Sequence, residues 1–136
     1  MLRYMLDTNF CIRLLRDRPK GLRDRFNANA DALCISTVIL YELLHGAEKS
    51  ARPIEGRKEV ERFAARVAVL PFDDAAAAHA ANIRASLERK GLTIGGYDLL
   101  IAGQARSAGL VVITGNLGEF KRVDGLIAED WQPDAS

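Results

Sequence analysis

Short apolar runs alternate with longer amphipathic stretches along the whole chain. A short apolar run is typical of a buried strand, whereas apolar residues spaced three and four apart indicate a helix that packs by one face. The expected strands cover residues 2–6, 33–35, 67–70, 110–113 and 126–127. The expected helices cover residues 9–15, 37–49, 53–66, 74–90 and 97–107. Gly91 and Gly109 follow the last two helices, at positions where glycine commonly ends a helix.

The order of these elements predicts the fold class. Strands that alternate with helices favour a three-layer α/β/α domain with a mainly parallel central sheet. The unbroken apolar run at 110–113 supports this prediction, because parallel strands are covered on both faces. The 136 residues suit a single domain, 1–136, and no repeat or linker divides them. In such sheets, ligands bind beyond the carboxyl ends of the strands.

The composition narrows the classes of protein to which the chain can belong. With 49% hydrophobic residues it is not a disordered chain, and its net charge of +1 gives it no overall attraction for nucleic acid. No apolar run approaches the roughly 20 residues of a membrane span, and the N-terminus lacks the pattern of a secretory leader. We therefore expect a cytoplasmic protein whose cysteines, Cys11 and Cys34, are reduced and buried.

Four acidic residues lie at positions that need an explanation. Asp7 directly follows the first strand and Asp98 begins a helix, so each can simply stabilise a helix N-terminus, as can Thr8. Glu42 lies on a helix that is apolar on nearly every side, where a carboxylate needs either an arginine partner or a bound cation. Glu119 follows the fourth strand in a loop whose glycines favour a plain turn.

Together these acids point to a metal site at the carboxyl edge of the sheet. Carboxylates gathered at one edge repel one another strongly unless a cation lies between them. Hard oxygen ligands suit Mg²⁺ or Mn²⁺ rather than zinc, which prefers histidine and cysteine. The two histidines lack zinc spacing, and we expect His79 to be structural or solvated and His45 to line the cleft.

A strongly basic segment begins soon after the first acid. Residues 13–25 contain six basic and two acidic residues. The basic residues are Arg13, Arg16, Arg18, Lys20, Arg23 and Arg25. Two interpretations stay open for this segment. It is either a solvated helical hairpin or a surface that contacts RNA phosphates, in which case RNA affinity falls as salt rises.

Several sequence blocks, taken in order, resemble one family. The chain resembles the PIN-domain ribonucleases and, more narrowly, the VapC toxins of type II toxin–antitoxin modules, over essentially its whole length. Within these toxins it looks most like the group that cuts the anticodon stem-loop of initiator tRNA. The blocks are 5–9 (MLDTN), 41–48 (YELLHGAE), 96–102 (GYDLLIA), 114–116 (TGN) and 119–120 (EF).

The resemblance implies a role for each matching residue. Asp7 and Asp98 match the metal-binding aspartates of the family. Glu42 matches its central acid and Glu119 its more variable fourth acid, and both are expected to bind metal through water or to orient the attacking water. All four are therefore candidate catalytic residues. The auxiliary residues of the cleft are Thr8, Asn9, Thr114 and Asn116.

The chain departs from the family pattern in two places. Gly115 and Gly118 occupy positions where bulkier polar residues are common, and Gly-Gly at 95–96 replaces the usual Gly-Pro. The first departure affects the surroundings of the fourth acid and the contacts with substrate. Because neither departure removes one of the core acids, we expect an active enzyme.

The resemblance also implies an activity and partners. It implies an endoribonuclease that depends on Mg²⁺, for which Mn²⁺ can substitute. The expected substrate is tRNA, with the anticodon stem-loop of initiator tRNA as the expected target. Cleavage of this RNA would inhibit translation. The resemblance further implies a VapB-type antitoxin, a toxin homodimer and a higher toxin–antitoxin complex. Two alternatives stay open: an RNA-processing PIN nuclease without an antitoxin, and a degenerate PIN domain that binds RNA or protein without catalysis.

Overall fold

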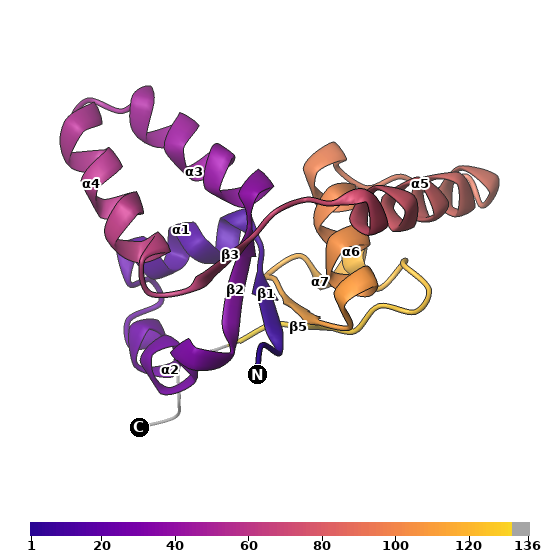
Figure 1. Ribbon diagram of the computed structural model, residues 1–136, viewed down its shortest axis with the longest axis horizontal. Helices are drawn as coiled ribbons and strands as arrows, with labels where there is room; N and C mark the ends of the chain where they lie inside the picture. Colours follow the sequence, from indigo (N-terminus) through magenta and orange to yellow (C-terminus); the bar gives the residue numbers. More distant parts are fainter. Residues whose placement is uncertain (132–136) are drawn as a thin grey trace.

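The strands of the computed structural model, which describes residues 1–131, form one parallel sheet (Figure 1). Its five strands lie in the order β3-β2-β1-β4-β5, and every neighbouring pair is parallel. Such pairing requires helical crossovers between the strands, which explains the alternation seen in the sequence. The strands are β1 Tyr4–Leu6, β2 Leu33–Ser36, β3 Ala68–Leu70, β4 Val111–Ile113 and β5 Ala128–Glu129.

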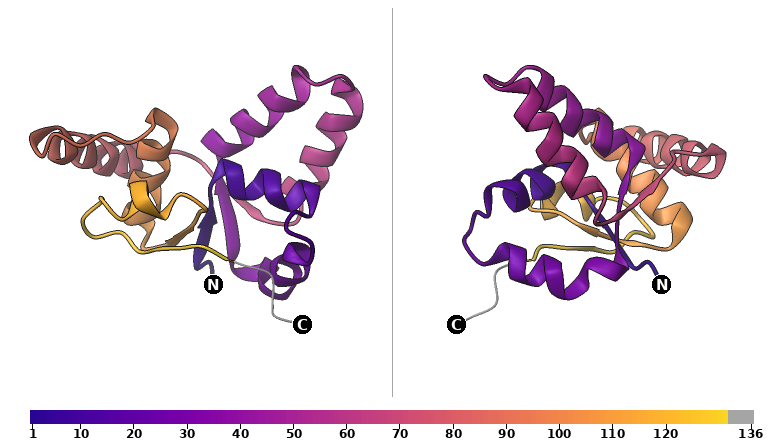
Figure 2. Two further views of the ribbon diagram at one scale, coloured as in Figure 1. Left: turned by 180° about the vertical axis from the view of Figure 1, so that it is seen from behind. Right: turned by 60° about the vertical axis from the view of Figure 1, so that its left-hand side comes forward.

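Helices cover both faces of the sheet. Figures 1 and 2 show α1 to α4 on one side of the strands and α5 to α7 on the other, which confirms the three-layer α/β/α prediction. Within residues 1–131, no helix has both the length and the apolar character needed to cross a membrane. The helices are α1 Thr8–Arg16, α2 Leu22–Asn29, α3 Thr37–Glu48, α4 Pro53–Ala64, α5 Asp74–Arg89, α6 Gly96–Ala108 and α7 Leu117–Phe120, with a 3₁₀ turn η1 at Ala30–Ala32.

Two of the expected elements are corrected by the structure. The last strand is Ala128–Glu129 rather than 126–127, and Ile127 is 65% exposed because it belongs to the approach to a short edge strand. Helix α2 occupies part of the basic segment that the sequence pattern left without a defined helix. Its buried apolar residues are Leu22 and Phe26, too few to produce a clear helical periodicity. The other expected elements are present, with ends shifted by a few residues.

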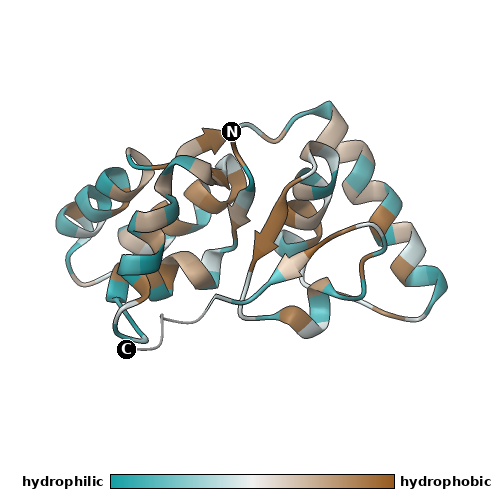
Figure 3. Cartoon of the chain, turned by 90° about the horizontal axis from the view of Figure 1, so that it is seen from below, coloured by the Kyte–Doolittle hydropathy of each residue, from teal (hydrophilic) through white to brown (hydrophobic). Residues whose placement is uncertain are grey.

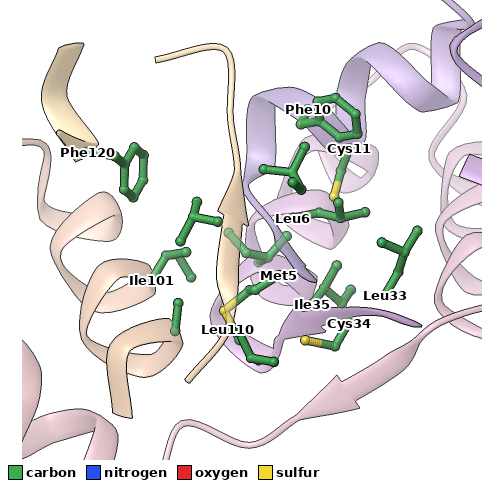
Figure 4. Packing of buried hydrophobic residues seen from close by; sticks show 14 of the residues in the cluster. Met5, Leu6, Phe10, Cys11, Leu33, Cys34, Ile35, Ile101, Leu110 and Phe120 are labelled. Atoms are coloured by element: carbon green, nitrogen blue, oxygen red, sulfur yellow. The ribbon is translucent and has the colours of Figure 1, made fainter. Parts of the chain in front are cut away.

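The core lies where the central strands meet the two helical layers. Figure 4 shows Met5 and Leu6 of β1 and Ile35 of β2 packed between helix residues from both layers, and all three are fully buried. Figure 3 shows the same division by hydropathy, with hydrophobic strands inside and hydrophilic residues on the outer helical turns. Cys11 and Cys34 are free and buried, as predicted, and burial raises the pKa of the Cys34 thiol to about 12.

The strand register aligns the carboxyl ends of β1 and β4. Leu6 pairs with Ile113, and the next backbone N–H, that of Asp7, donates to the Ile113 carbonyl at 3.1 Å. The chains leave both strands at the same level, so the residues that follow them, Asp7 and Thr114, lie at the same edge of the sheet. The functional side chains described below lie at this edge.

Close packing between α5 and α6 depends on one glycine. A Cβ atom at Gly103 of α6 would lie 2.6 Å from the backbone nitrogen and 2.7 Å from the Cα atom of Ala80 in α5. Because backbone atoms cannot move aside as a flexible side chain can, any larger residue must separate the two helices.

We therefore expect Gly103→Ala to lower the free energy of unfolding by about 1–3 kcal/mol, the usual cost of overpacking. Gly46→Ala is the matched control, because Gly46 is also helical but has no heavy atom within 4 Å of the added Cβ. This control should be neutral or stabilising by up to about 1 kcal/mol, since alanine favours helix. Urea unfolding of both variants measures the difference; equal effects would contradict the close contact.

Candidate active site

Asp7 lies at the carboxyl end of β1 and caps α1. Its backbone is extended, its carboxylate accepts a 2.8 Å hydrogen bond from the Phe10 N–H, and the residue is 3% exposed. Burial raises the pKa of Asp7, while hydrogen bonds from Thr114 and Phe10 and the charge of Arg13 partly lower it. The helix-capping interpretation is therefore correct, but capping uses only part of the hydrogen-bonding capacity of this carboxylate.

Asp98 and Glu119 approach each other from two helices. Asp98 lies in the first turn of α6, and Glu119 lies in α7 after β4. Burial raises the pKa of Asp98 to about 7, with further contributions from hydrogen bonding to Glu119, from the charge of Glu119, and then from Asp7 and Glu42. Asp98 therefore lies close enough to each of the other three acids to interact with it electrostatically.

Glu42 is fixed by a residue at the start of α1. The Thr8 hydroxyl donates a 2.6 Å hydrogen bond to Oε1 of Glu42, which joins α1 to α3. The Glu42 side chain is half-buried, and none of the ion pairs found within residues 1–131 involves it. The interpretation of Glu42 as the partner of an arginine is therefore wrong. The hydroxyl group of Thr8 satisfies one carboxylate oxygen but does not neutralise its charge.

The auxiliary residues divide into two groups. Thr8 and Thr114 bond directly to acids, and the Thr114 hydroxyl also accepts a 2.8 Å hydrogen bond from the Asn116 N–H. Asn9 and Asn116 are exposed, and none of the side-chain hydrogen bonds found in residues 1–131 uses their amide groups. Two threonines thus organise the carboxylates, while two asparagines face the solvent beside them.

One carboxylate oxygen in this cluster lacks a partner. Oε2 of Glu119 is buried, and when Asp98 is ionised no group in residues 1–131 donates a hydrogen bond to it. A buried polar atom without a partner costs about 1–3 kcal/mol. A divalent cation fits this oxygen and its neighbour Asp98. A water bound to the ion would donate a hydrogen bond to Oε2 of Glu119, and the charge of the ion would reduce the repulsion at Asp98.

The described side chains do not enclose an ion completely. Within residues 1–131, no three His, Cys, Asp or Glu side chains converge closely enough to form a metal site by themselves. This arrangement is compatible with Mg²⁺, which keeps several of its waters and takes only one or two protein carboxylates together with substrate phosphates. Such a partial ligand set is available here, because the charges of Asp7, Glu42 and Glu119 all act on Asp98.

The basic residues of 13–25 have different environments. Arg23 donates from Nε to the Leu14 carbonyl at 3.0 Å and so binds the end of α1, while Arg25 lies 4.7 Å from the Trp131 ring centroid. Arg13 pairs with Asp130 at 3.2 Å, an interaction across 117 positions that no local sequence signal reveals. The remaining basic residues, Arg16, Arg18 and Lys20, are exposed.

The two histidines have different surroundings. Nδ1 of His79 accepts a 2.9 Å hydrogen bond from Arg106, in agreement with the structural role predicted for it. His45 stacks on Tyr41 at 6.2 Å in a groove along the outer face of α3. The lining of this groove contains none of the four acids, but His45 lies one turn after Glu42 on α3, so its place along the carboxylate cleft stays a prediction.

Comparisons with known proteins identify the family. A family model described as PIN domain matches residues 4–126. The tRNA(fMet)-specific endonuclease VapC of Shigella flexneri is 50% identical over 131 residues, covering 96% of this chain and 99% of the relative. Ribonuclease VapC2 of Haemophilus influenzae (strain ATCC 51907 / DSM 11121 / KW20 / Rd) is 44% identical, with the same coverage of both chains.

Solved structures give the same result. The crystal structure of DNA-bound VapBC from Salmonella typhimurium matches with a TM-score of 0.93 and 50% identity, covering 97% of this chain and 100% of that chain. VapBC2 from Rickettsia felis, bound to a DNA fragment from its promoter, matches with a TM-score of 0.90 and 32% identity, covering 96% and 100%. This chain therefore belongs to the PIN-domain family and, within it, to the VapC proteins.

Proposed function

We propose that this chain is a metal-dependent endoribonuclease, the toxin of a type II toxin–antitoxin module, and that it cleaves initiator tRNA in the anticodon stem-loop. The observation that carries the proposal is the unpartnered, buried Oε2 of Glu119 beside the strained Asp98 carboxyl group. The names of the VapC relatives, among them a tRNA(fMet)-specific endonuclease, support the choice of substrate. The protein acts in the cytoplasm, on the translation machinery.

In this proposal the four acids divide the work of hydrolysis. Asp7 and Asp98 would hold the cation directly, while Glu119 and Glu42 would contact it through water or orient the attacking water. A bound Mg²⁺ or Mn²⁺ supplies a more acidic water and neutralises charge on the phosphate. The Thr8 hydroxyl holds the Glu42 carboxylate in place, and this carboxylate would accept the proton that the attacking water loses. Attack in line breaks the bond from phosphorus to the 3′ oxygen and leaves a 5′-phosphate and a 3′-hydroxyl.

The partners follow from the same family membership. The solved relatives are VapBC complexes, which supports a VapB-type antitoxin as the partner that restrains this chain. We also propose a toxin homodimer and a higher toxin–antitoxin assembly. A nuclease without an antitoxin is less well supported, because the solved relatives are toxin–antitoxin complexes. A non-catalytic domain is less well supported, because retained buried acids destabilise a protein that makes no use of their charge.

Removal of one acid tests the catalytic assignment. Asp7→Asn should lower the rate of RNA cleavage at least 100-fold, because the amide is a poor metal ligand, yet its oxygen can still accept the Phe10 N–H. The thermal midpoint should not fall. Asp31→Asn, a change in an exposed residue just before β2 at the amino edge of the sheet, is the control and should keep full activity. Normal cleavage by Asp7→Asn would disprove the role of Asp7.

The raised pKa of Asp98 predicts a pH-dependent stability. The folded protein holds this proton up to about pH 7 whereas the unfolded chain releases it near 3.8, so the metal-free protein loses stability as pH rises between these values. In EDTA at pH 8, Asp98→Asn should therefore be more stable than the wild type by about 1–2 kcal/mol, a value discounted for partial solvent screening. Near pH 3.5 the two proteins should be equally stable.

Urea unfolding at both pH values, with and without Mg²⁺, provides the measurement. Mg²⁺ should stabilise the wild type at pH 8 and have little effect on Asp98→Asn, because the variant lacks one direct ligand. If Asp98→Asn were no more stable than the wild type at pH 8 in EDTA, the pKa of Asp98 would not be raised in the folded protein, and this prediction would be wrong.

The exposed basic residues before α2 are proposed RNA contacts. Replacing Arg16, Arg18 and Lys20 together with glutamine should lower the slope of log affinity against log salt by about 2, since each phosphate contact contributes roughly 0.7–0.9. The control replaces three exposed basic residues near or on α4, namely Arg52, Lys58 and Arg62. The salt slope is measured by fluorescence anisotropy on a labelled RNA stem-loop, and an unchanged slope in the first variant would remove these residues from the RNA surface.

A further inference from the structure

We propose that the Arg13 guanidinium group binds an RNA phosphate at the edge of the carboxylate cluster, and that it lies there because Gly115 has no side chain. The inference rests on the proposed ribonuclease function. It adds a phosphate-binding site that requires the side chain of Arg13 and the absence of a side chain at Gly115. Arg13 comes from the last turn of α1, and Gly115 from the loop between β4 and α7.

Arg13 occupies the space that a side chain at residue 115 would take. An ideal Cβ atom on Gly115 would lie 2.9 Å from Nη2 and 3.3 Å from Cζ of Arg13. Both distances are shorter than ordinary van der Waals contact. Gly118, three residues later in the same region, has no heavy atom within 4 Å of its added Cβ. The close approach is therefore specific to Gly115.

Two contacts hold the guanidinium group in this place. Nη2 of Arg13 donates to Oδ1 of Asp130 at 3.2 Å, and its Cζ lies 5.1 Å from the centroid of the Phe10 ring. An arginine held between a carboxylate and an aromatic ring loses little further freedom when it binds a ligand. The Arg13 side chain is still 28% exposed, so an anion from the solvent can reach it.

Arg13 keeps most of its donors for such an anion. A guanidinium group has five N–H donors, and the hydrogen bond found for this side chain within residues 1–131 uses one of them. Planar, paired N–H groups match phosphate oxygens well. The remaining donors lie beside the exposed backbone of Gly115, next to Thr114, which bonds to Asp7.

The charges around the carboxylate cluster explain why a positive group beside it would help to bind RNA. No ion pair within residues 1–131 joins a lysine or arginine to Asp7, Glu42, Asp98 or Glu119. An RNA phosphate that enters the cluster is repelled by these acids. Arg13 is near enough for its charge to act on Asp7, so it offers a fixed positive group at the entrance. Arg23 and Arg25 bind other parts of the fold and do not provide this charge.

The test compares Arg13→Gln, Gly115→Ala and the double variant in steady-state cleavage of an RNA stem-loop with Mg²⁺. We expect Arg13→Gln to lower kcat/KM about tenfold, the loss of one charged hydrogen-bonded contact. Gly115→Ala should lower kcat/KM several-fold because its Cβ displaces the guanidinium group. The double variant should be no worse than Arg13→Gln, since the displaced group is already absent. Gly46→Ala is the matched control and should cleave at the wild-type rate, because its added Cβ meets no heavy atom within 4 Å and Gly46 lies outside the carboxylate cluster.

A second measurement distinguishes phosphate binding from a structural role. In the inactive background Glu42→Gln, Arg13→Gln should lower the salt slope of RNA binding by about 1, the value for one lost phosphate contact. Arg13→Lys should restore most of this slope. Asp130→Asn weakens the contact between residue 130 and Arg13 but keeps the positive charge of Arg13. It should therefore leave the salt slope unchanged.

The outcomes separate this inference from the proposed function. If the wild type cleaves RNA while Arg13→Gln retains its kcat/KM and salt slope, the phosphate site is disproved and the ribonuclease function stands. Independent, multiplicative effects of Arg13→Gln and Gly115→Ala would also overturn the inference, because they would show that the two residues do not share one space. If the wild type cleaves no RNA with Mg²⁺ or Mn²⁺, the proposed function itself fails.

Discussion

The register of β1 between β2 and β4 is the constraint on which the rest of the structure depends. It sets the level at which the chain leaves the sheet at Asp7 and Thr114, and the hydrogen bond between these residues follows from that level. Helices α3 and α6 then bring Glu42 and Asp98 to the same edge. A shift of one residue in β1 would move Asp7 to the other face of the sheet and disperse the cluster.

The cluster shows how one residue can serve the fold and the chemistry together. Asp7 caps α1 through one carboxylate oxygen, as any well-placed N-terminal aspartate can. Its burial and its acidic neighbours nevertheless make its charge unfavourable in the isolated protein. The carboxylates that could bind a cation at this edge therefore lower the stability of the metal-free fold. Such a conflict is common at catalytic sites. The fold tolerates the strain because Met5 and Leu6 of β1 and Val112 and Ile113 of β4, directly behind this edge, are fully buried.

Gly115 and Arg13 depend on each other at the edge of the cluster. The loop after β4 is glycine-rich, and at Gly115 the missing side chain leaves room for a guanidinium group from another helix. The departure of this loop from the family pattern thus has a physical consequence in this chain. The space that a side chain of the loop would fill is occupied by the Arg13 guanidinium group, which contacts Asp130 and Phe10.

The sequence by itself determined the fold class, most of the elements and the four acids. Apolar runs and helix-ending glycines are local signals, and a carboxylate such as Glu42 on an apolar helix is conspicuous without any coordinates. Helix α2 and strand β5 were not located correctly, because each buries too few residues to impose a periodicity. Only the tertiary structure decided which polar groups meet. Thr8 with Glu42, Glu119 with Asp98, and Arg13 with Asp130 lie far apart in sequence, and their contacts depend on the three-dimensional packing of strands and helices.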